Sequence, residues 1–76
     1  MANQFDGVRP ASESSIEIEF QYRGTLRRER LRLKPSASNL KRASALRAEI
    51  VRAIAEDSFD YAAAFPKSKN AAQFRD

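Results

Sequence analysis

Apolar and polar residues alternate strictly over residues 15–22, with isoleucine, isoleucine, phenylalanine and tyrosine at every second position. A period of two is typical of a β-strand with one face in the core and one in solvent. The apolar positions are β-branched or aromatic, the types that strands favour. Arg23 and Gly24 follow and fit a two-residue hairpin turn, in which glycine supplies a positive φ. Residues 25–33 are therefore predicted to return as an antiparallel strand.

Pairing the two strands tests this hairpin. With Tyr22 opposite Thr25, the apolar side closes with Ile16 opposite Leu31. On the other face each arginine meets an acid or a serine, which is mildly stabilising for opposite charges. Those pairs are Glu19 with Arg28, Glu17 with Arg30 and Ser15 with Arg32.

Two pairs on the apolar side fit a core poorly. Ile18 lies opposite Glu29, and Phe20 lies opposite Arg27. We expect this side either to be open near the turn, or to pair Arg27 and Glu29 with each other or with the helix predicted after Pro35.

Residues before and after the hairpin predict one further strand and one helix. Residues 7–9 form a short candidate strand that ends at Pro10, and a polar loop follows to Ser14. Beyond Pro35, apolar residues recur at spacings of three and four, which predicts a helix over residues 39–57. Its stripe consists of Leu40, Ala43, Leu46, Ile50 and Ile54. Three polar residues are candidate N-caps: Ser36, Ser38 and Asn39.

Aromatic residues dominate the segment after this helix, at Phe59, Tyr61 and Phe65, before Pro66 blocks a further helix. Aromatic rings can stack on the bases of single-stranded nucleic acid. These rings lie away from the arginines, so we expect them instead to fold back and cover the end of the core.

Positive charge is concentrated in the middle of the chain. Ten basic residues and two acids lie between positions 21 and 52, a local charge of +8 in a chain whose net charge is +4. Such segregation is the electrostatic footprint of polyanion binding. Arginine outnumbers lysine ten to four, and arginine makes bidentate contacts with phosphate and guanine. The balance favours a polyanion partner over a merely solvated surface.

The chain of 76 residues has no cysteine and no histidine. It is long enough for one small domain with a thin core. Thiolate chemistry, the commonest general base and the commonest neutral metal ligand are all excluded. No serine and carboxylate stand at a spacing that suggests a nucleophile with its base. We expect no catalytic residue, no cofactor and no metal.

Residues two apart on a strand share a face, so Arg28, Arg30 and Arg32 are predicted to point the same way. A sheet face that carries arginines can enter the major groove. Binding of DNA is therefore the leading hypothesis, with RNA bound by the same face as a variant. The candidate DNA-binding residues are Arg9, Gln21, Arg23, Arg27, Arg28, Arg30, Arg32 and Lys34.

Three other interpretations remain open. The arginine face can be a solvated surface that Glu17 and Glu19 neutralise. The domain can be a protein-interaction module that docks on an acidic partner. Lys41 and Arg42, expected in the first turn of the helix, can contact phosphates that flank a groove.

The chain resembles the N-terminal arm-type DNA-binding domain of phage integrases, which are tyrosine recombinases. The similarity covers residues 7–66 and includes the hairpin and parts of the helix. Its most distinctive part is the closing motif, formed by Phe59-Asp60-Tyr61 and Phe65-Pro66.

The resemblance implies a small α+β fold, in which a three-stranded antiparallel β-sheet packs against one C-terminal α-helix. It implies binding of double-stranded DNA at arm-type attachment sites during site-specific recombination (DNA integration and excision), with other integrase protomers as further candidate partners. Residues 1–66 would form this domain, and 67–76 a linker toward a core-binding and catalytic region whose catalytic residues have no counterpart here.

No apolar run is long enough to span a membrane, and the polar N-terminus is unlike a signal peptide. We expect a cytoplasmic, non-catalytic domain in a bacterial host, on DNA, without a membrane or small-molecule partner.

Overall fold

A computed structural model describes residues 7–71, which form three strands and two helices in chain order. These elements are β1 (Val8–Ser12), β2 (Ser15–Tyr22), β3 (Thr25–Leu31), α1 (Ala37–Ala55) and α2 (Tyr61–Ala64). The strands make one antiparallel sheet in the order β1-β2-β3. The predicted α+β class, with a small sheet packed against a helix, is confirmed.

The β2–β3 hairpin has the predicted register. Tyr22 lies opposite Thr25 and Ile16 opposite Leu31, with every intervening pair as expected. The turn residues Arg23 and Gly24 both have a positive φ, 53° and 76°. Two consecutive left-handed residues define a turn whose twist matches that of the flanking strands.

Strand β1 is longer than the sequence indicated. We expected Pro10 to end it, but the strand continues to Ser12 and only Glu13 and Ser14 remain for the turn. Proline is tolerated here because β1 is an edge strand, where a missing amide hydrogen disrupts no inner ladder. The register shifts between Pro10 and Ser12, which marks a β-bulge.

Three other predicted boundaries shift by two residues each. Strand β3 ends at Leu31 rather than at residue 33, because the amide of Leu33 donates to the carbonyl of Leu31 across 2.8 Å. Arg32 therefore lies in a tight turn, outside the strand alternation, and its expected pairing with Ser15 is not formed. Helix α1 begins and ends two residues earlier than predicted, with Ser36 as the N-cap that accepts from the amide of Asn39 and Glu56 as the C-cap.

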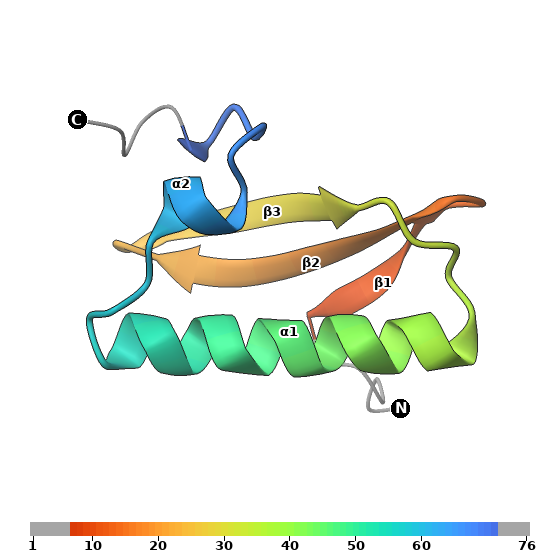
Figure 1. The fold of residues 1–76 in the computed structure, drawn as a ribbon, viewed down its shortest axis with the longest axis horizontal. Helices are drawn as coiled ribbons and strands as arrows, with labels where there is room; N and C mark the ends of the chain where they lie inside the picture. Colours follow the sequence, from red (N-terminus) through yellow and green to blue (C-terminus); the bar gives the residue numbers. More distant parts are fainter. Residues whose placement is uncertain (1–6, 72–76) are drawn as a thin grey trace.

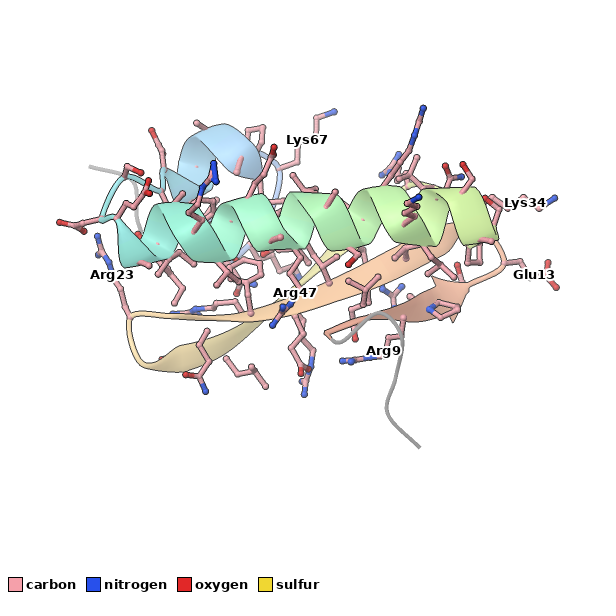
Figure 2. All side chains as sticks on the ribbon, turned by 90° about the horizontal axis from the view of Figure 1, so that it is seen from below. Arg9, Glu13, Arg23, Lys34, Arg47 and Lys67 are labelled. Carbon is pink, nitrogen blue, oxygen red and sulfur yellow. The ribbon has the colours of Figure 1, made fainter. Side chains whose placement is uncertain are left out.

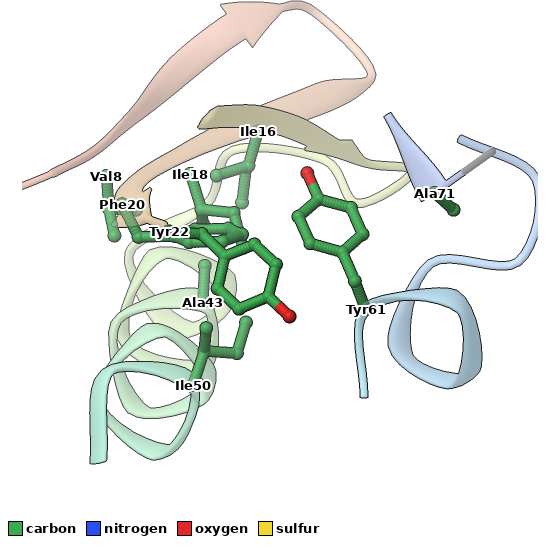
Figure 3. Packing of buried hydrophobic residues seen from close by; sticks show 9 residues of the cluster. All are labelled: Val8, Ile16, Ile18, Phe20, Tyr22, Ala43, Ile50, Tyr61 and Ala71. Atoms are coloured by element: carbon green, nitrogen blue, oxygen red, sulfur yellow. The ribbon is translucent and has the colours of Figure 1, made fainter. Parts of the chain in front are cut away.

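The core lies between the sheet and the helices (Figure 1). Strand β2 is its largest contributor, with four of the nine buried apolar residues in the described part of the chain, and α1 contributes Ala43 and Ile50 (Figure 3). Leu40 and Ile54 also pack against the core, but Leu46 is exposed. Its expected place in the stripe belongs instead to Arg47, whose Nε donates to the carbonyl of Glu19 at 2.6 Å.

The segment after α1 covers the end of the core, as predicted from its aromatic residues. The Tyr61 ring is 1% exposed, and its centroid lies 5.9 Å from that of Phe20 and 5.5 Å from that of Tyr22. Phe59 packs against the rings of Phe20 and Tyr22, and Phe65 packs against those of Phe20 and Tyr61. These aromatic side chains are therefore part of the core, and the base-stacking interpretation is wrong for Tyr61.

Residues 67–71 also pack on the domain, although we expected a linker to begin there. Ala71 is fully buried, and Ser68 and Asn70 both donate to Glu29. The remainder of the expected linker, 72–76, and the first six residues lie outside the described part of the chain.

Replacing Gly7 with alanine is expected to destabilise the fold by at least about 2 kcal/mol, measured by chemical denaturation. Its φ is 77°, and a left-handed backbone costs an L-residue about 1–2 kcal/mol. An added Cβ would also lie 2.2 Å from Nε of Arg47, a side chain held by its bond to β2.

Gly24→Ala is the matched control for that substitution. Gly24 has nearly the same φ, 76°, but an added Cβ there meets open space. It is expected to lose only the backbone cost, about 1–2 kcal/mol. Equal losses for the two variants would show that the Gly7–Arg47 contact contributes nothing.

Candidate nucleic-acid interface

The candidate site is the face of the sheet that points away from the helices, called the outer face below. Within residues 7–71, both helices lie on the opposite side of the sheet (Figure 2). The alternation of the strands sends several polar side chains outward. The outer-face residues are Arg9, Glu17, Glu19, Gln21, Leu26, Arg28 and Arg30.

A chain of ion pairs crosses the outer face from β1 to β3. Nη2 of Arg9 lies 2.7 Å from Oε2 of Glu17 and 2.8 Å from Oε2 of Glu19. Nε of Arg28 lies 2.8 Å from the same oxygen of Glu19. The hydrogen bonds from Arg9 and Arg28 lower the pKa of Glu19 below its usual range. Glu19 thus stays ionised and holds two arginines of the outer face in fixed positions.

Arg30 and Arg32 differ from the arginines of that chain of ion pairs. Arg30 lies opposite Glu17, as predicted, but the carboxylate of Glu17 pairs with Arg9. Within residues 7–71, neither Arg30 nor Arg32 has an acidic group within ion-pair distance. Both side chains are exposed. Their charge is therefore available to an external anion.

The other candidate residues lie around this surface or away from it. Gln21 is exposed on the outer face, and Arg23 is at the hairpin tip, with its guanidinium 5.1 Å from the Tyr22 ring centroid. Lys34 is exposed after the end of β3. Arg27 lies opposite the buried Phe20, so it projects toward the helix side and does not join the outer-face arginines.

The interpretation of the basic helix residues changes with the structure. Because α1 begins at Ala37, Lys41 and Arg42 lie in its second turn, beyond the free amides that attract anions. Leu26, which is not among the residues predicted to bind DNA, is 46% exposed on the outer face opposite Gln21. A large apolar side chain at an exposed strand position was the signal available for it.

Glu29 is a buried carboxylate on the helix side of β3, only 7% exposed. The segment after α1 supplies three donors to its Oε2: the hydroxyl of Tyr61, the hydroxyl of Ser68 at 2.7 Å and Nδ2 of Asn70 at 2.9 Å. Burial, together with the bond to Glu29, raises the pKa of Tyr61. The tyrosine therefore remains a donor. Glu29 pairs with the C-terminal segment, rather than with α1 as one expectation had it.

The site and fold together define a small α+β domain with a cationic sheet face. The family model for the arm DNA-binding domain matches residues 5–69. The chain therefore belongs to this family, and it is a DNA-binding, non-catalytic domain. Comparisons with curated proteins and with solved structures gave no match. Neither helix in residues 7–71 is long and apolar enough to cross a membrane.

Proposed function

We propose that the domain binds double-stranded DNA by laying the outer face of its sheet in the major groove. The observation that carries the proposal is the exposed cationic surface of β3, where Arg28 and Arg30 point away from the core. The major groove is about 12 Å wide and admits a small β-structure as well as a helix. The described helices lie behind the sheet and leave this approach open.

Different residues of the outer face suit different contacts. Arg28 and Arg30 have the planar fork that binds the O6 and N7 atoms of guanine, or a phosphate. Gln21 can make a bidentate pair with adenine, and the exposed Leu26 beside it can contact a thymine methyl group. Arg23, at the tip of the hairpin turn, can contact the sugar-phosphate backbone of the DNA.

Glu17 and Glu19 have a positioning role in this proposal. Their carboxylates hold Arg9 and Arg28 across the strands, so these guanidinium groups are oriented before DNA arrives. Preorganised side chains lose less conformational entropy on binding. The same carboxylates repel phosphate. On binding, Arg9 and Arg28 therefore exchange part of their pairing with the glutamates for contacts with the DNA.

The biological setting that the family supports is site-specific recombination by a phage integrase. In this proposal the domain binds arm-type attachment sites in the cytoplasm of a bacterial host. A tyrosine recombinase of which it forms part would supply the catalytic residues, and neighbouring integrase protomers would be its protein partners.

An NMR titration of the ¹⁵N-labelled domain with a generic duplex, at two salt concentrations, tests the proposal. We expect shifts on the outer-face residues and the hairpin turn that weaken as salt rises, because phosphate contacts release counterions. The exposed face of α1 serves as the internal control and should remain unchanged. If no shifts appear at low salt, docking on an acidic protein becomes the better explanation of the charge.

A further inference from the structure

A cleft opens at the end of the sheet where the β1–β2 turn meets the exit of β3. The segment after α2 forms its other wall. Three cationic side chains, Arg30, Arg32 and Lys67, line this cleft with several serines. It shares only Arg30 with the outer face and extends beyond it, because Lys67 stands on the helix side of the sheet near α2 (Figure 2).

The chemistry of the cleft fits a phosphate group. Arginine and lysine supply charge-assisted hydrogen bonds to phosphate oxygens, and serine hydroxyls can donate as well. Ser12 and Ser14, at the β1–β2 turn, are among its lining residues. The one carboxylate in the wall is Glu29, whose charge is already bound by three donors of the C-terminal segment.

Arg30 connects this cleft to the outer face. It projects outward from β3 and also lines the cleft. When a sheet occupies the major groove, a phosphate backbone runs along each side of it. Strand β3 is an edge strand, so in the proposed binding mode one DNA backbone would pass beside it, next to the cleft.

We propose that this cleft binds a backbone phosphate of the same DNA duplex, with Lys67 as a phosphate contact supplied by the C-terminal segment. This inference rests on the proposed function and extends the DNA-binding surface beyond the sheet. The segment 67–71, expected to be a linker, then contributes directly to DNA binding.

Salt-dependent binding of a generic duplex, measured by fluorescence anisotropy for Lys67→Ala and Lys69→Ala, tests this inference. For Lys67→Ala, the negative slope of log K against log salt is expected to become shallower by about 0.9, the value for one phosphate contact. Affinity should fall uniformly across unrelated duplexes. Lys69 is the matched control, because it is an exposed lysine two residues away that does not line the cleft.

Arg28→Ala, on the outer face, separates the two proposals. If Arg28→Ala weakens binding while Lys67→Ala and Lys69→Ala behave alike, the cleft is not a phosphate site and the outer face still is. If the wild-type domain binds no duplex, both proposals are overturned. The same holds if Arg28→Ala, Lys67→Ala and Lys69→Ala all bind DNA as tightly as the wild type does. Loss of slope in Lys67→Ala alone among the two lysine variants supports the cleft.

Discussion

Arg28→Ala combined with Arg30→Ala is expected to cause the largest loss of DNA binding of any pair of substitutions in this domain. On a generic duplex, the negative slope of log K against log salt should become shallower by about 2, because each arginine neutralises about one phosphate. On a specific site, each arginine that reads a base should cost roughly 1–3 kcal/mol. Fluorescence anisotropy over a range of salt concentrations measures both quantities.

The fold should survive this double substitution. Both side chains are exposed, and Arg28 makes a surface ion pair with Glu19, a kind of interaction that contributes little to stability because solvent screens it. The matched control is Arg42→Ala with Arg52→Ala, which removes the same charge from exposed positions on α1. Equal losses in the two double variants would mean that net charge, and not the outer face, determines binding.

Glu29→Ala is expected to destabilise the domain by about 3 kcal/mol, since each buried donor left without its acceptor costs about 1–3 kcal/mol. Tyr61, Ser68 and Asn70 all donate to this carboxylate. For a domain of this size, whose total stability is roughly 4–11 kcal/mol, that loss is severe. The melting temperature should fall by roughly 12–24 °C in a thermal scan followed by circular dichroism.

Glu49→Ala provides the control for this loss, because Glu49 is an exposed acid on α1. Its effect should stay within about 0.5 kcal/mol. Hydrogen exchange gives a second measurement: amides of residues 61–71 should lose protection in Glu29→Ala more than those of α1 do. A melting temperature equal to that of Glu49→Ala would contradict the role assigned to Glu29.

The hairpin and its faces were predictable because both depend on local rules. Strict alternation from residue 15 to 22 determines which side chains enter the core, and a two-residue turn at Arg23 and Gly24 determines the register. The stripe of α1 was predictable for the same reason, except at Leu46. There the requirement for a partner at the carbonyl of Glu19 places Arg47 against the sheet instead.

The sequence by itself determined the α+β class, the β2–β3 register, the arginine-bearing outer face and the aromatic closure of the core. The first three follow from periodicity and from contacts between near neighbours in the chain. The aromatic closure follows from the composition of residues 59–65, because large apolar rings after the last helix need burial. Only the tertiary structure decided the end of β3, the length of β1 beyond Pro10 and the partners of Glu29. The donors to Glu29 come from 32 to 41 residues away. No local pattern encodes them, since a buried carboxylate becomes stable only when packing brings its donors together.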